Sequence, residues 1–239
     1  MKIIELPIQF LYEGQPYLIY PSLIVSGEKL TLVDAGYPGF MPLIEEEIQR
    51  QGYDPAKLSH IIITHYDDDH IGALRDFREK YPALTIIASE AEAPFISGAA
   101  EAERLVQAKE LLAQMAEEER AFGERFVGEL QALQHVAVDR TVRDGEWILD
   151  AKVQVLATPG HTSGHISLYC PELDSVITGD AAVSEQNRLV VANPQYCLDL
   201  ERAEQSLDRL QALNAHTYYC YHGGQHRVTR ENTAHTDAC

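Results

Sequence analysis

The chain has 239 residues, 45 % of them hydrophobic, which is enough for one large domain with a substantial core. Its 19 basic and 37 acidic residues give a formal charge of −18, which repels phosphate backbones and anionic lipids. We therefore expect no nucleic-acid and no membrane partner. The N-terminus resembles no secretory signal, and no CxxC pair occurs, so we expect a cytoplasmic protein with reduced thiols. The four cysteines are Cys170, Cys197, Cys220 and Cys239.

The first 35 residues predict β structure, because "YLIYPSLIVS" and "KLTLVDAG" are rich in β-branched and apolar residues. A helix is predicted over "MPLIEEEIQRQGY", where Ile44 and Ile48 stand four residues apart. A short buried strand follows in "KLSHIIITH", then a helix in "LRDFREKYP" and a strand in "ALTIIAS".

The composition changes at about residues 90–134, which are rich in Ala, Glu, Leu and Gln. We predict two helices here, broken near Gly123 and inserted between strands. Such a pair could serve as a lid, as the contact of a homodimer, or simply as a cover for the core. One face of the first helix is predicted to carry Leu105, Ala108, Leu112 and Met115.

Strands return in "EWILDAKVQVLATPG", "ISLYCPELDSVITGD" and "TYYCYHGG", with one more helix in "LDLERAEQSLDRLQAL". Strands dominate both ends of the chain and helices intervene, a pattern that favours an α/β sandwich. No linker or repeat marks a boundary, so residues 1–239 are predicted to form a single domain.

Histidine and aspartate gather where apolar runs stop: in "IIITHYDDDH", "VLATPGH", "VITGD" and "YYCYH". Side chains at the ends of strands can converge on one edge of a sheet, where loops carry function. Imidazole and carboxylate together suit divalent metals, and two metals about 3.5–4 Å apart form a common hydrolytic centre. The alternative is an acidic helix start at "DDDH", since aspartate is a frequent N-cap residue.

In this order, "THYDDDH", "TPGHTSGH", "TGD" and "YHGG" resemble the successive motifs of the metallo-β-lactamase-fold superfamily. The resemblance covers about residues 18–226 except 90–134, and is nearest to the glyoxalase II and lactonase branches. It implies a four-layer αββα sandwich that binds one or two metal ions between its sheets.

The resemblance also implies a set of ligands for two divalent ions, with zinc as the first expectation and iron or manganese as alternatives. The first ion would be held by His65, Asp67 and His161. The second would be held by Asp69, His70 and His222, with Asp180 bridging both. His216 and His226 are nearby rivals of His222, whereas His165 is expected to hydrogen-bond behind the ligands.

The chain departs from the family at Asp67, because the first motif usually reads HxHxDH and here reads HxDxDH. Three carboxylates against two divalent ions leave a net charge of +1, where the usual two would leave +2. An additional anionic oxygen ligand favours harder ions such as iron or manganese over zinc.

The activity implied is hydrolysis of a small ester, lactone, thioester or amide by a water or hydroxide activated between the ions. Asp69 is expected to relay a proton, and a metal ion or a phenol, that of Tyr37 or Tyr196, to stabilise the leaving group. Val183 stands where lactonases commonly carry a tyrosine, which weakens the assignment as a lactonase. The basic residues that bind glutathione in glyoxalase II are not evident near the C-terminus beyond Arg227 and Arg230, which weakens the match to that branch too. A di-iron or mono-iron redox protein of the same fold is the alternative, and a non-catalytic binding module is a third reading.

Overall fold

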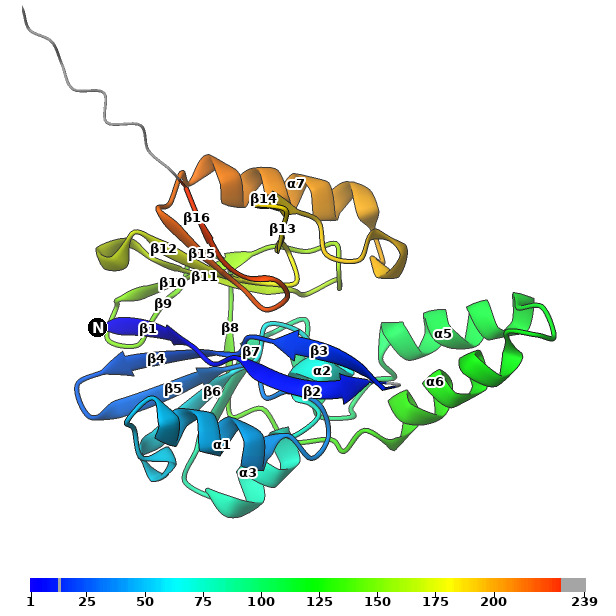
Figure 1. The fold of residues 1–239 in the computed structure, drawn as a ribbon, viewed down its shortest axis with the longest axis horizontal. Helices are drawn as coiled ribbons and strands as arrows, with labels where there is room; N and C mark the ends of the chain where they lie inside the picture. Colours follow the sequence, from blue (N-terminus) through cyan, green and yellow to red (C-terminus); the bar gives the residue numbers. More distant parts are fainter. Residues whose placement is uncertain (13, 229–239) are drawn as a thin grey trace, which may run out of the picture.

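Two six-stranded β-sheets face each other, and helices cover their outer faces, so the layers run α, β, β, α (Figure 1). This computed structural model describes residues 1–12 and 14–228. The α/β sandwich predicted from the sequence is therefore confirmed. The expectations for Arg230 and Cys239 lie outside the described residues.

The first sheet pairs its early strands antiparallel and its later strands parallel, from β5 onward. Parallel neighbours need crossover connections, and α1 and α3 supply two of them. In spatial order the strands are β1 (Lys2–Glu5), β4 (Ser22–Ser26), β5 (Lys29–Val33), β6 (Leu58–Ile62), β7 (Thr85–Ser89) and β8 (Arg140–Val142).

The second sheet is antiparallel except where β12 pairs with β15 across the crossover through α7. Two short hairpins, β2–β3 and β13–β14, stand apart from both sheets. The strands of the second sheet are β16 (Gly224–Arg227), β15 (Thr217–Cys220), β12 (Ser175–Gly179), β11 (Ile166–Cys170), β10 (Val153–Ala157) and β9 (Trp147–Ile148). The hairpins are β2 (Ile8–Tyr12) with β3 (Gln15–Ile19), and β13 (Val183–Glu185) with β14 (Arg188–Val190).

Three apolar clusters fill the three interfaces between the four layers. Ile62 and Val155 belong to the cluster between the two sheets. Ile44 packs in the cluster under the helices of the first sheet, and Leu210 in the cluster under the helix of the second. These helices are α1 (Met41–Arg50), α3 (Leu74–Lys80) and α7 (Leu200–Ala212). This rigid core fixes the ends of the strands that carry the histidines and aspartates.

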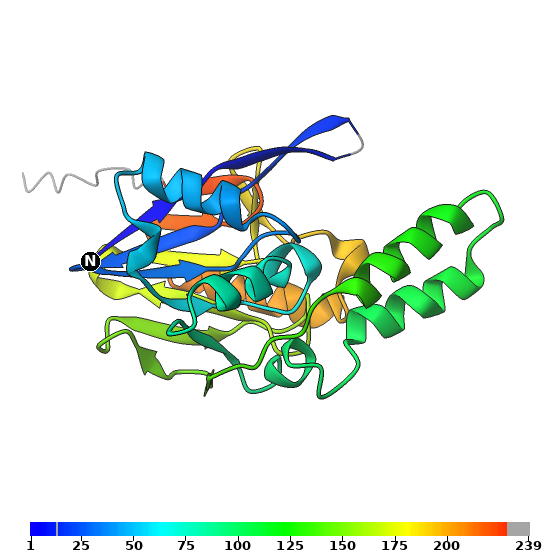
Figure 2. The same ribbon diagram turned by 90° about the horizontal axis from the view of Figure 1, so that it is seen from below.

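The inserted helices project from one side of the sandwich (Figures 1 and 2). They are α5 (Glu103–Gln114) and α6 (Arg120–Ala132), whereas the short helix α4 (Ala93–Ile96) before them buries Ile96 in the core. The predicted break near Gly123 is wrong, because α5 ends at Gln114 and Gly123 lies inside α6. Gly123 instead permits close packing of the pair: a Cβ there would lie 2.6 Å from Met115 Sδ. Within the described part of the chain, no helix is long and apolar enough to cross a bilayer.

Candidate metal centre

The first motif follows β6, whose buried isoleucines anchor the chain before it turns into the short helix α2 (Asp68–Ile71). Asp67 occupies the N-cap position of α2, yet its side chain makes no capping hydrogen bond. Its carboxylate points instead toward His161, with Oδ2 3.1 Å from Nε2. The acidic-helix-start alternative therefore does not account for this side chain.

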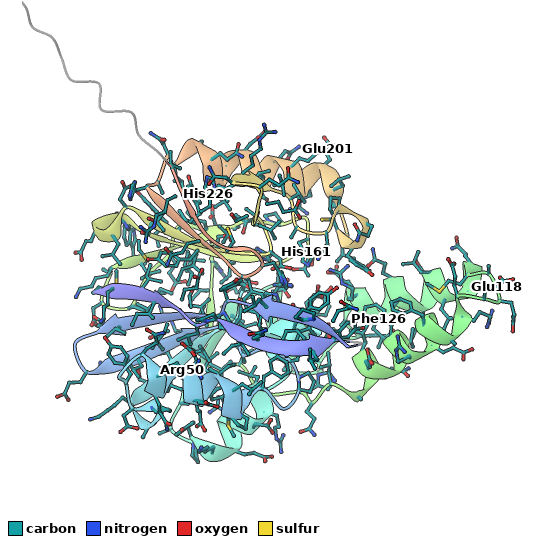
Figure 3. All side chains as sticks on the ribbon, in the orientation of Figure 1. Arg50, Glu118, Phe126, His161, Glu201 and His226 are labelled. Atoms are coloured by element: carbon teal, nitrogen blue, oxygen red, sulfur yellow. The ribbon has the colours of Figure 1, made fainter. Side chains whose placement is uncertain are left out.

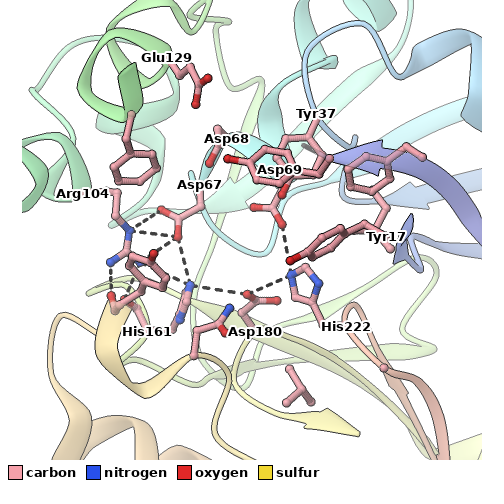
Figure 4. Close-up of a pocket in the computed structure, with 18 of the residues that line it drawn as sticks. Tyr17, Tyr37, Asp67, Asp68, Asp69, Arg104, Glu129, His161, Asp180 and His222 are labelled. Carbon is pink, nitrogen blue, oxygen red and sulfur yellow. Dashed lines mark hydrogen bonds and ion pairs between the residues drawn. The ribbon is translucent and has the colours of Figure 1, made fainter. Parts of the chain in front are cut away.

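Two groups of donor atoms lie side by side at the edge between the sheets. Figure 4 shows four of their members, Asp69, His161, Asp180 and His222. His65, His161 and Asp180 form one group, and Asp69, His70 and His222 form the other. Within each group, one donor atom per residue lies within 4.8 Å of the others. Asp180 also approaches the second group, with Oδ2 3.5 Å from His222 Nε2. Four segments that are distant in sequence thus bring together six of the seven residues assigned to the two ions, whereas Asp67 belongs to neither group.

Three donor atoms in these groups are buried and make no hydrogen bond: His65 Nε2, His70 Nε2 and Asp180 Oδ1. The last two lie 3.4 Å apart, within ion-pair distance of each other. A buried polar atom without a hydrogen bond carries a free-energy penalty of about 1–3 kcal/mol. All three atoms face the space that the two groups surround, and their lone pairs are of the kind that divalent ions bind. The donor set therefore fits a pair of metal ions.

The carboxylates give the site an affinity for positive charge. Burial opposes protonation of the imidazoles, yet a hydrogen bond to Asp67 raises the pKa of His161 to about 9. Burial likewise opposes a charge on His222, but Asp180 and Asp69 raise its pKa to about 10. Burial would raise the pKa of Asp180, whereas His222 and His70 hold it well below its usual range. The negative charge that keeps His161 and His222 protonated also attracts divalent cations, and binding of a cation would displace the protons from these imidazoles.

Residues behind the donor groups fix the orientation of the imidazole rings. Asp34 Oδ2 lies 3.0 Å from His70 Nδ1, so Nε2 faces the centre. His165 Nε2 accepts a hydrogen bond from the Asp180 N–H at 2.9 Å, and its Nδ1 lies 2.8 Å from Thr158 Oγ1. His165 thus has both nitrogens engaged, in keeping with the role expected from the sequence.

The backbone before Asp180 requires glycine. Gly179 has φ +53°, and a Cβ there would lie 2.7 Å from His165 Nε2 and 2.9 Å from Thr64 Cβ. β12 brings Asp180 close to both of these neighbours. The glycine of "TGD" is therefore needed both because a side chain would clash and because its φ is positive.

Asp67 has a second partner that the sequence did not reveal, Arg104 on the inserted helix α5. Arg104 is 3 % exposed, and its Nη2 donates to Asp67 Oδ2 at 2.8 Å while Nε lies 3.2 Å from Oδ1. Nη1 donates to the Tyr196 carbonyl and to Gln107 Oε1. Burial would raise the pKa of Asp67, but Arg104 holds it well below the usual range. The insertion therefore supplies a fixed positive charge at the edge of the centre.

Glu92, just before α4, connects two of the motif loops. Its Oε2 accepts from the Tyr66 N–H at 3.0 Å, and its Oε1 accepts from Thr162 Oγ1 at 2.7 Å and from the Gly164 N–H at 2.9 Å. Tyr66 stands between His65 and Asp67, and Thr162 follows His161. One fully buried carboxylate thus fixes the spacing between the first and second motifs.

Replacing Glu92 by glutamine should weaken this connection. Glutamine offers one acceptor in place of two, so its amide N–H would face at least one of the three donors. We expect the free energy of unfolding to fall by about 1–3 kcal/mol and metal affinity to fall with it. Urea unfolding and metal competition titrations measure both quantities, with the exposed Glu90→Gln as the control. Unchanged stability and unchanged metal affinity would contradict this role.

The two candidate tyrosines and the preferred histidine from the sequence analysis lie around the cavity in front of the donor groups. Tyr37 and Tyr196 both line this cavity, which has a volume of about 610 Å³. Burial, with the nearby charge of Asp69, raises the pKa of Tyr37 and keeps its phenol neutral. Of the rival histidines, His222 is the one beside Asp69, at 3.2 Å between Nε2 and Oδ2, whereas His226 pairs with Tyr218 on β15.

The comparison with known families decides the classification. A family model described as the metallo-beta-lactamase superfamily matches residues 15–222. The chain belongs to this superfamily. The resemblance seen in the sequence motifs is therefore confirmed over most of the chain.

Curated relatives in the superfamily are moderately similar. The probable metallo-hydrolase YflN of Bacillus subtilis is 28 % identical over 206 residues, covering 80 % of this chain and 74 % of the relative. The hydroxyacylglutathione hydrolase of Brucella anthropi is 29 % identical over 183 residues, covering 75 % of this chain. The chain spans only 52 % of that enzyme, about half its length.

Solved structures of the superfamily share the fold. A metallo-beta-lactamase family protein from Thermus thermophilus matches with a TM-score of 0.68 at 23 % identity, covering 94 % of this chain and 74 % of that protein. A metallo-beta-lactamase from Pontibacter korlensis matches with a TM-score of 0.65 at 16 % identity, covering 95 % and 89 %. At such identities the likeness concerns the fold.

Proposed function

We propose that the protein is a binuclear metal-dependent hydrolase of a small ester, lactone, thioester or amide. The observation that carries the proposal is the pair of adjacent donor groups, with three buried donor atoms that make no hydrogen bond, at the base of a cavity. His65, His161 and Asp67 would hold one ion, Asp69, His70 and His222 the other, and Asp180 both. Metallo-hydrolases and hydroxyacylglutathione hydrolases among the relatives support a hydrolase generally.

The ions would supply an acidified water nucleophile and polarise the carbonyl of the substrate. The protein's own groups would do the rest. Asp69 is 9 % exposed and lines the cavity, so its carboxylate is placed to accept and relay a proton. The neutral phenol of Tyr37, which also lines the cavity, is placed to donate a hydrogen bond to a leaving group.

Turnover by protein of known metal content tests the proposal. Protein loaded with zinc or manganese would be assayed against chromogenic esters, lactones, thioesters and phosphodiesters. We expect hydrolysis of carbonyl substrates that disappears with a chelator and returns on metal addition. Activity that survives complete metal removal, or hydrolysis of phosphodiesters alone, would refute the assignment.

A redox protein with one or two irons is the second candidate, because Asp67 adds an anionic oxygen near the first ion. Arg104 weakens this argument, since its guanidinium compensates the additional negative charge. Iron content with oxygen consumption would favour redox chemistry, whereas zinc or manganese with ester turnover would favour hydrolysis.

Asp67 should also control the choice of metal. Asp67→His alone would leave the buried Arg104 facing imidazoles, so the test combines it with Arg104→Met. We expect the double variant to shift selectivity from manganese toward zinc, because imidazole is a softer ligand than carboxylate. Competition between Zn²⁺ and Mn²⁺, with Arg104→Met alone as the control, measures the shift. Unchanged selectivity would refute a ligand role for Asp67.

A further inference from the structure

Aromatic side chains from two segments outside the sandwich form the walls of the cavity. The hairpin β2–β3 contributes Phe10, Tyr12 and Tyr17, and helix α6 contributes Phe122 and Phe126. Phe126 lies midway along α6, and Figure 3 labels it where the inserted helices adjoin the sandwich. Further apolar lining comes from Ile19, Leu133 and Val183. A cavity lined in this way binds apolar groups through burial of their surface.

The charged residues of the cavity are almost all acidic. Beyond the carboxylates of the donor groups, Asp68, Glu129 and Glu185 line it, and none of the three forms an ion pair with a described residue. Arg104 is the sole Lys or Arg among the described lining residues. Its donors are already directed at Asp67, Gln107 and the Tyr196 carbonyl.

An anionic group on the substrate would therefore meet carboxylates along the walls, where the described lining residues offer no Lys or Arg free to pair with it. With two divalent ions bound, Asp67, Asp69, Asp180 and one hydroxide would cancel the charge of the metals. Arg104 would then add one positive charge against two negative ones on Glu129 and Glu185. A neutral apolar substrate avoids both the repulsion and the loss of water from a charged group.

We propose that the substrate of this hydrolase is an uncharged ester or thioester with an apolar group of several carbons, held between the β2–β3 hairpin and α6. The inference rests on the proposed function and narrows it. It sets the chain apart from hydroxyacylglutathione hydrolase among its relatives, because a glutathione thioester carries two carboxylates.

Matched substrates test this preference. 4-Nitrophenyl heptanoate would be compared with 4-nitrophenyl acetate and with 4-nitrophenyl 7-sulfoheptanoate, whose terminal sulfonate is a weak metal ligand. We expect kcat/KM for the heptanoate to exceed that for either other ester by about tenfold or more. Equal or faster turnover of the sulfonated ester would overturn the proposal.

Two charge-reversal variants locate the effect in the cavity. Glu129→Lys should narrow the preference for the neutral ester about fivefold or more, because it places a cation on the wall formed by α6. Glu124 is on the same helix but does not line the cavity. Glu124→Lys should therefore leave the ratio of kcat/KM for the neutral and the sulfonated ester unchanged. An unchanged ratio in Glu129→Lys, or equal changes in both variants, would contradict the placement.

A binding measurement separates this inference from the proposed function. Octan-2-one and 7-oxooctane-1-sulfonate resemble the two acyl groups and cannot be hydrolysed. Calorimetry on the metal-loaded protein should show octan-2-one binding about tenfold or more tighter. If that preference appears and no ester is hydrolysed, the proposed function fails and the cavity assignment stands. If esters are hydrolysed and the sulfonate binds as tightly, the cavity assignment fails alone.

Discussion

Asp180→Ala should lose both metal ions and lower kcat/KM for the best ester by a factor on the order of 10³ or more. Asp180 lies between the donor groups, with its carboxylate oxygens 3.4 Å from His70, 3.6 Å from His161 and 3.5 Å from His222. Its removal takes a ligand from both ions and leaves three imidazoles without their shared counter-charge. Metal analysis of the purified variant and steady-state kinetics measure the two effects.

Two companion variants make the Asp180 result interpretable. Asp208→Ala removes an exposed aspartate from α7 and should retain metal and activity. Asp180→Asn preserves the shape of the side chain, so a folded Asn variant that lacks metal separates ligand loss from misfolding. Full activity with two bound ions in Asp180→Ala would show that the ligand assignment is wrong.

Arg104→Met should destabilise the metal-free protein by about 3 kcal/mol, because the buried Asp67 carboxylate loses its guanidinium partner and keeps only the His161 imidazole beside it. Both side chains are buried, with 4 % and 10 % of their surface exposed. When ions are bound they compensate Asp67 in place of the guanidinium, so the loss should be smaller in metal-loaded protein. Chemical unfolding with and without metal measures the difference.

A double-mutant cycle measures the interaction energy between Arg104 and Asp67. Arg104→Met with Asp67→Asn removes both charges and should recover much of the lost stability, since neither charge is then left unpaired. Arg120→Met breaks an exposed contact to Glu124 on α6 and should cost less than about 1 kcal/mol. A similar loss in metal-free and metal-loaded Arg104→Met would contradict the proposal that Arg104 and the ions compensate the same carboxylate.

The strands that carry the donor residues could be predicted from sequence because each is a short apolar run that stops at a histidine or aspartate. Hydrophobic burial fixes such runs in the core, so the polar residues after them must emerge at a sheet edge. The resemblance of the motifs to those of the superfamily then implied the ligand set, which was His65, Asp67, Asp69, His70, His161, Asp180 and His222. The extent of a single domain over residues 1–239 stays a prediction.

The partners of these residues could not be predicted, because they depend on how separate segments pack. Arg104 lies 37 positions from Asp67 on an amphipathic helix, where an arginine normally faces solvent. Glu92 likewise is one of two glutamates in "ASEAEAPF" with nothing to distinguish them, and its burial follows only from the approach of the second motif. The break between α5 and α6 was misplaced because Gly123 serves packing against Met115 and does not end a helix.

Anomalous diffraction from crystals of the metal-loaded protein, recorded at the absorption edge of the metal, tests the central claim most directly. We predict two peaks about 3.5–4 Å apart, one beside His65 and His161, the other beside His70 and His222, with Asp180 between them. A single peak elsewhere, or no peak among these residues in protein that hydrolyses esters, would contradict the account.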